Sequence, residues 1–60
     1  MNPKFELNQI VFHNLPEGEK GKIIDIRYCY LFKLFEYYVT FGVGRNFWLC
    51  ENEISDKRTF

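Results

Sequence analysis

The stretch GEKGKIIDI, residues 18–26, decides the fold, because it places two glycines around a charged pair and continues as an apolar, strand-like run. Gly21 permits a close approach of the backbone where the strand leaves its loop. Ile23 interrupts the alternation that Ile24 and Ile26 follow. We therefore expect the strand to enter the core at Ile23, and a twist or a β-bulge to turn Ile26 inward as well. A small β-barrel requires a strand that curls in this way.

Short strand-forming segments lie on both sides of this stretch. Strand-favouring residues are spread over the whole chain, alanine is absent, and no segment has the pattern of a well-capped amphipathic helix. The predicted elements are strands at residues 9–13, 21–30, 36–41 and 47–50, a single-turn helix at 51–54 with Ile54 on the core, and a closing strand at 57–60. Turn residues separate them at 14–18 and 42–46. Strands this short predict a meander that closes into a barrel and leaves no exposed edge.

The connection LFKLF, residues 31–35, joins two predicted strands without Gly, Pro, Asn or Asp. It lacks helix caps and is flanked by strong strand formers, so the preferred interpretation is a hairpin with a protruding apolar tip. A helix is the alternative, because one of its faces would carry five apolar residues: Tyr30, Leu31, Leu34, Phe35 and Tyr38.

Composition supports one small domain with spare aromatic side chains. The chain has 60 residues, of which 47% are apolar and 20% aromatic. A chain of this size buries only about 60% of the surface that its unfolded form exposes. Its formal net charge is zero, from eight basic and eight acidic residues, whereas a dedicated nucleic-acid-binding domain is usually basic. The aromatics beyond those the core needs are therefore the first indication of a binding role.

The two cysteines, Cys29 and Cys50, are predicted to be small core hydrophobes in a reducing compartment, with a disulfide as the alternative. Together with the single His13 they are too few for a structural zinc site, so no metal is expected. The N-terminus lacks the continuous apolar segment of a signal peptide, and the apolar stretch at 28–41 is too short to span a bilayer. We expect a cytoplasmic protein with no membrane contact.

No constellation of catalytic residues stands out. His13 has no local Ser, Cys or acidic partner in a recognisable pattern. Glu51 and Glu53 fit a solvated helical turn better than a carboxylate pair. Gly42 and Gly44 are not followed by the Lys-Ser/Thr of a phosphate-binding loop. We expect no enzyme activity, no cofactor and no small-molecule substrate.

The order of these segments resembles a known family. Residues 7–12 and 18–26 resemble the KOW motif of SH3-like barrels, and residues 38–42, 47–49 and 53–54 are similar to the later strands and terminal turn of Tudor-like and KOW-like domains. The resemblance implies one domain over residues 1–60: an all-β, small SH3-like barrel of about five short antiparallel strands with a single-turn helix near the C-terminus. KOW domains often contact RNA or transcription and ribosomal proteins, and Tudor-like domains often bind peptides in aromatic cages. In this chain Asn8 and Gln9 stand where the opening strand typically carries a glycine–aspartate pair.

Three hypotheses for function follow. The leading one is a non-catalytic protein-interaction module, in its simplest version a homodimer, that uses an aromatic and apolar surface made of Tyr30, Leu31, Phe32, Leu34, Phe35, Tyr38 and Trp48. The alternative is RNA binding by a KOW-like domain, in which stacking on the aromatics is combined with a basic rim of Lys20, Lys22, Arg27 and Arg45. The third is a structural part of a larger assembly.

Overall fold

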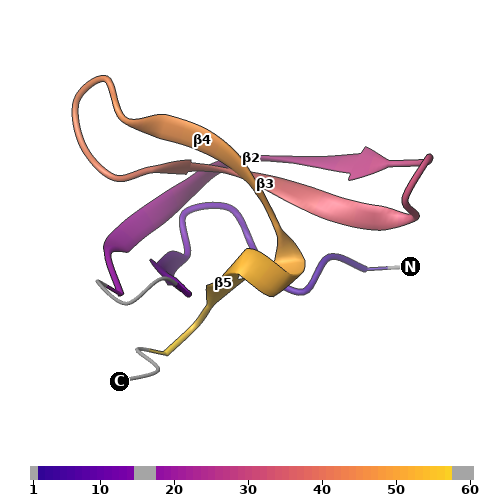
Figure 1. The fold of residues 1–60 in the computed structure, drawn as a ribbon, viewed down its shortest axis with the longest axis horizontal. Helices are drawn as coiled ribbons and strands as arrows, with labels where there is room; N and C mark the ends of the chain where they lie inside the picture. The colour runs from indigo at the N-terminus through magenta and orange to yellow at the C-terminus, as the bar shows by residue number, and fades with distance from the viewer. Residues whose placement is uncertain (1, 15–17, 58–60) are drawn as a thin grey trace.

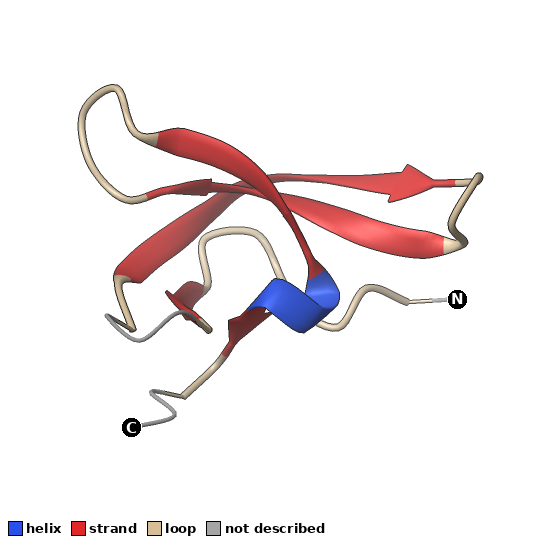
Figure 2. Ribbon diagram, in the orientation of Figure 1, coloured by secondary structure: helices blue, strands red, loops and turns tan. Residues whose placement is uncertain are grey.

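The computed structural model describes residues 2–14 and 18–57 as one antiparallel sheet with a single 3-10 turn (Figures 1 and 2). The sheet has five strands in the order β4-β3-β2-β1-β5, which confirms the predicted all-β class. In chain order the elements are β1 (Ile10–His13), β2 (Lys20–Cys29), β3 (Leu34–Thr40), β4 (Asn46–Cys50), the 3-10 helix η1 (Glu51–Glu53) and β5 (Ile54–Ser55). In the described ranges no helix is long and apolar enough to cross a membrane.

The strand predicted at residues 57–60 lies largely outside the described ranges, which end at Lys57, a residue in a bend. The last described strand, β5, begins at Ile54, directly after η1, and pairs with β1 opposite His13, with the Ile54 side chain buried. The prediction of a closed barrel is wrong. β4 and β5 are the two ends of the sheet, and η1 connects them where a closed barrel would have a ladder of hydrogen bonds.

The predicted bulge lies in β2. The register with β3 shifts between Ile23 and Asp25, so Ile24 is the extra residue. Ile23 is fully buried and Ile26 packs against the core, whereas Ile24 is 42% exposed. The break in alternation therefore turns Ile23 and Ile26 inward, as predicted.

Gly21 of β2 lies against the side chains of Val39, in β3, and of Phe41, the residue that follows β3. A Cβ atom at this position would be 2.6 Å from Val39 Cγ1 and 2.8 Å from Phe41 Cε1. Gly21 is buried and pairs with Val11 of β1, which is itself fully buried. The absence of a side chain therefore lets β1 and β2 curl over the core, which is the role predicted for this glycine.

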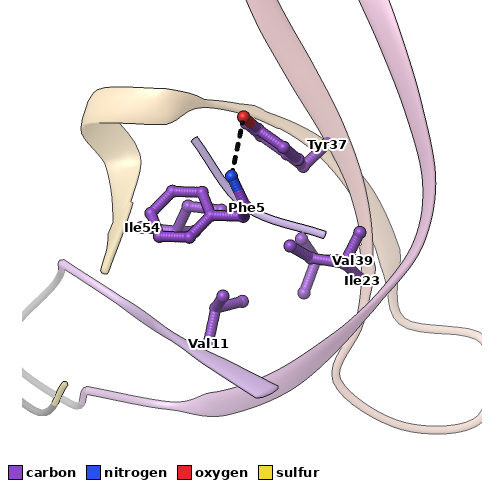
Figure 3. Close-up of a cluster of buried hydrophobic side chains, with 6 residues drawn as sticks. All are labelled: Phe5, Val11, Ile23, Tyr37, Val39 and Ile54. Carbon is purple, nitrogen blue, oxygen red and sulfur yellow. Dashed lines mark hydrogen bonds between the residues drawn. The ribbon is translucent and has the colours of Figure 1, made fainter. Parts of the chain in front are cut away.

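The core lies on the inner face of the curled sheet and is small (Figure 3). Its buried side chains are Phe5, Val11, Ile23, Tyr37, Val39 and Ile54. Five of these come from strands, but Phe5 comes from the segment that precedes β1, for which no structure was predicted. Phe5 packs on the inner face of the sheet, and its ring contacts the Tyr37 ring edge-on with centroids 5.3 Å apart.

The Tyr37 hydroxyl connects this N-terminal segment to η1. It accepts hydrogen bonds from the backbone N–H groups of Lys4 (2.9 Å) and Phe5 (3.3 Å), and donates one to Glu51 Oε1 (2.9 Å). Burial, more than any other effect, raises the pKa of the Tyr37 hydroxyl, and the hydrogen bond from Phe5 opposes that rise. The hydroxyl therefore stays protonated and joins three segments of the chain.

Replacing Gly21 with alanine is expected to lower the free energy of unfolding by about 1–3 kcal/mol, because the new methyl group overpacks the core against Val39 and Phe41. Urea unfolding followed by tryptophan fluorescence measures the change. The matched control is Lys22→Ala, an exposed neighbour on the same strand, for which a change within about 0.5 kcal/mol is expected. Equal stabilities of Gly21→Ala and the control would contradict the close approach.

Candidate interaction surfaces

The β2–β3 hairpin carries an exposed apolar tip, here defined as Tyr30, Leu31 and Phe32. The last ladder pair joins Cys29 to Leu34, and the three tip residues are 83%, 81% and 69% exposed. Lys33 closes the turn with a φ of 55°, so a non-glycine residue adopts the left-handed conformation. The hairpin extends away from the rest of the molecule (Figure 1). The predicted protruding hairpin is confirmed, and the helical alternative is wrong.

A short series of rings supports the base of this tip. The Tyr28 ring packs edge-on against Phe35 across the two strands, with centroids 4.9 Å apart, and against Tyr30 at the same separation. Phe35 is half-buried and also packs on the core, and Leu34 is half-buried. Of the residues predicted for the surface, Phe35 therefore links the tip to the core.

Tyr38 and Trp48 lie elsewhere, on the outer face of the sheet. They are cross-strand partners of β3 and β4, with ring centroids 4.9 Å apart and planes 32° apart. The guanidinium carbon of Arg27 is 4.0 Å from the centre of the Trp48 ring, and Arg27 Nε donates to Glu36 Oε1 at 2.7 Å. The predicted aromatic surface is therefore two separate surfaces: the tip, and an outer-face cluster of Arg27, Glu36, Tyr38 and Trp48.

The basic residues proposed for nucleic-acid binding do not form one rim. Arg27 is paired with a glutamate of β3, and Arg45 makes a two-point ion pair with Glu19, through Nη1–Oε2 and through Nη2–Oε1 at 2.8 Å. Lys20 and Lys22 are exposed on β2, opposite residues of β1. Carboxylates beside two of the four basic side chains weaken the attraction of this surface for phosphate.

A pocket that the sequence did not predict opens beside β4. It has a volume of about 520 Å³ and is lined by His13, Glu19, Phe41, Arg45, Phe47, Trp48 and Leu49. The Phe41 ring lies between those of His13 and Phe47, at centroid distances of 6.0 and 6.3 Å. The β1–β2 turn brings His13 next to Glu19, since the His13 N–H donates to the Glu19 carbonyl at 2.9 Å. The proximity of His13 and Glu19 follows from the β1–β2 hairpin, which is local in the sequence. The contact of this hairpin with residues 41–49 is long-range, and the sequence pattern does not predict it.

Electrostatics at the pocket rim follow from the ion pair. The hydrogen bond from Arg45 is the main cause that lowers the pKa of the Glu19 carboxyl, and the charges of Arg45 and His13 act in the same direction while desolvation opposes them. Glu19 in turn raises the pKa of the Arg45 guanidinium. Both groups are charged at neutral pH, so the rim is polar but locally neutral.

The two cysteines are free thiols on the outer face, where both are half-buried, so the prediction that they belong to the core is wrong. β3 separates Cys29 on β2 from Cys50 on β4. Neighbouring strands lie about 4.8 Å apart, and the β3 partners of the two cysteines, Leu34 and Glu36, are two residues apart. The Cα atoms of the cysteines are therefore more than about 10 Å apart, beyond the ~7 Å limit for a disulfide. The intramolecular disulfide alternative is therefore also wrong. Burial is the main cause that raises the pKa of the Cys50 thiol, and Glu53 and Glu36 add to it.

Within residues 2–14 and 18–57, no group of three or more His, Cys, Asp or Glu side chains is arranged to hold a metal ion. Comparison with the models of known protein families, with curated proteins and with solved structures yields no match. The chain's own surfaces are therefore the basis for inferring its function.

Replacing Arg45 with glutamine is expected to raise the pKa of Glu19 toward its ordinary range, because the guanidinium is the main cause of the lowering. The lowered folded-state pKa means that Glu19 stabilises the fold above its unfolded-state pKa. That contribution is lost as the pH falls through the folded-state pKa. NMR titration of the Glu19 carboxyl carbon measures the shift, with Arg27→Gln as the control that leaves it unchanged. An identical Glu19 pKa in wild type and Arg45→Gln would refute the ion pair.

Proposed function

We propose that this chain is a non-catalytic protein-interaction module that inserts the tip of its β2–β3 hairpin into an apolar pocket of a partner protein. The observation that carries the proposal is the exposure of Tyr30, Leu31 and Phe32 at 83%, 81% and 69% in consecutive positions. Covering one such side chain stabilises a complex by about 1.5–3 kcal/mol. Three in a row, at the end of a hairpin, form a compact apolar docking element.

The base of the hairpin supports this role. The rings of Phe35 and Tyr28 brace Tyr30 from the core outward, at 4.9 Å between successive centroids. A braced tip loses less conformational freedom when it is bound than a flexible loop does. The ring contacts therefore hold Tyr30 in place before binding, so that less conformational entropy is lost when a partner covers the tip.

The shape of the tip favours a partner with a concave surface. Two copies that meet tip to tip are the simplest version of the proposal, but two convex ends cover each other poorly. Three such side chains per copy bury together about 900–1,500 Å² when fully covered, at the low end of the ~1,200–2,000 Å² of a stable interface. A pocket on another protein covers the same side chains on several sides.

The proposal extends to fold family and location. The strand order and the 3-10 turn before β5 support a relationship with SH3-like barrels of the KOW and Tudor-like kind, of which this sheet would be an open form. We also propose a cytoplasmic location, in which Cys29 and Cys50 remain reduced.

The test compares wild type with the triple change Tyr30→Ser, Leu31→Ser and Phe32→Ser. Because all three side chains are exposed, the variant is expected to unfold at nearly the same urea concentration. Both proteins are used as bait in extracts of the source cells, and each captured protein is then purified and titrated. We expect a partner whose dissociation constant rises at least about 100-fold with the triple variant, because three anchors are lost and each is worth more than about 1 kcal/mol.

Val43→Ser is the matched control, since Val43 is fully exposed on the neighbouring β3–β4 hairpin. It is expected to leave that affinity unchanged. Sedimentation tests the tip-to-tip version: a dimer that dissociates in the triple variant supports it. If no purified protein, including a second copy of the chain, distinguishes the triple variant from wild type, the proposal is overturned.

A further inference from the structure

We propose that β4 pairs antiparallel with β4 of a second copy of this chain, about a two-fold axis at Trp48, so that two five-stranded sheets become one. This interface is separate from the tip and does not depend on it. The dimer would present one tip on each copy, which gives a bivalent module.

β4 is a sheet edge with little protection against pairing with another strand. Its ladder neighbour in the described ranges is β3, and it is the longer of the two edge strands, at five residues against two for β5. Proteins usually protect an exposed edge with charges, proline or a bulge. The sequence of β4, NFWLC at residues 46–50, has no charge and no proline, and its register with β3 is regular.

The backbone polar groups of β4 point alternately toward β3 and away from it. The Phe41 N–H donates to the Arg45 carbonyl at 2.9 Å, so this pair is hydrogen-bonded in the antiparallel pattern. By alternation, Phe47 and Leu49 also bond to β3, and the N–H and C=O groups of Asn46, Trp48 and Cys50 point away from it.

The side chain of Glu53 already uses one of these outward groups. Its Oε1 accepts from the Cys50 N–H at 2.7 Å, which agrees with the outward direction inferred for that residue. The backbone groups of Asn46 and Trp48 carry no such cap in the described structure. At the outer edge of β4, the Cys50 N–H is therefore already hydrogen-bonded, whereas the outward backbone groups of Asn46 and Trp48 are available to pair with another strand.

The sequence of β4 is complementary to itself in an antiparallel pairing. A two-fold axis at Trp48 places Asn46 opposite the partner subunit's Cys50 and Phe47 opposite the partner subunit's Leu49. Outward-pointing backbone groups then meet outward-pointing groups, as an antiparallel ladder requires. Because the Cys50 N–H stays bonded to Glu53, each 46–50 pair has one ladder bond, from the Asn46 N–H to the partner subunit's Cys50 carbonyl. Phe47, which is 51% exposed and lines the pocket beside β4, would gain an apolar neighbour across the axis.

Charge complementarity selects this register and this partner. The next pair outward sets Arg45 against the partner subunit's Glu51, and the symmetry repeats this pair at the other end. Arg45 uses Nη1 and Nη2 for Glu19, which leaves its Nε–H to donate. Glu51 uses Oε1 for Tyr37 and Lys4, and Oε2 remains to accept. A strand of unrelated sequence would lack these two symmetry-related pairs of arginine and glutamate.

The direct test is a cysteine placed across the axis. Asn46→Cys would set a thiol opposite the partner subunit's Cys50, at the ~5.5 Å Cα separation of a hydrogen-bonded pair, which lies within disulfide range. We expect mild oxidation to give a disulfide-linked dimer, and peptide mapping to show the link between residues 46 and 50. The matched controls are Asn46→Cys combined with Cys50→Ser, and Lys22→Cys on the exposed face of β2. Both are expected to give little dimer.

Sedimentation equilibrium gives a second, independent measurement. Asn46→Pro removes one outward N–H at the first residue of the strand without removing a bond to β3, a position where proline is tolerated. We expect wild type and the tip triple variant to dimerise equally, and Asn46→Pro to raise the dimer dissociation constant at least tenfold with unchanged circular dichroism. A wild-type monomer at several hundred micromolar, a dimer lost in the tip variant, or a disulfide that maps to Cys29 would each overturn the proposal.

Discussion

The buried hydroxyl of Tyr37 is the interaction on which the rest of the structure depends. A single curled sheet has one face to cover, and the chain offers no helix layer in the described ranges to cover it. The N-terminal segment takes that place through Phe5, and the hydroxyl holds the backbone of this segment at Lys4 and Phe5. The same oxygen donates to Glu51 at the start of η1, which leads the chain into β5. One polar atom in the core thus fixes both ends of the described fold.

Because the Tyr37 hydroxyl stabilises the fold from within the core, the far end of the β2–β3 hairpin and the outer edge of β4 are not needed to hold the fold together. The bulge at Ile24 assigns the two faces of β2: Ile26 turns toward the core, and Arg27 turns outward over Trp48. Beyond the core the hairpin continues with rings that support one another up to Tyr30. The proposed contacts therefore use surfaces that can be altered without removing a core side chain.

Local patterns in the sequence were sufficient for the bulge and the tip. Two adjacent isoleucines break a strict alternation, and a twist or a bulge is needed to turn Ile26 back toward the core; the structure has the bulge. The connection at 31–35 has neither helix caps nor turn residues, so an exposed hairpin tip was the remaining solution. Long-range features were out of reach. Tyr37 and Tyr38 are adjacent and chemically alike, and only the register of the sheet decides which one is buried. Phe5 precedes any periodic pattern, and the pocket joins the β1–β2 turn to residues more than twenty positions away.

The most direct test of this account is the free energy of unfolding of Tyr37→Phe, which keeps the ring and removes the hydroxyl. A loss of about 1–3 kcal/mol is predicted, because Glu51 and the amides of Lys4 and Phe5 lose a partner in a partly buried site. Hydrogen exchange at the Lys4 and Phe5 amides should accelerate with it, whereas Tyr38→Phe should change neither quantity. A Tyr37→Phe protein as stable as the wild type, with the N-terminal amides still protected, would contradict the central role of this hydroxyl.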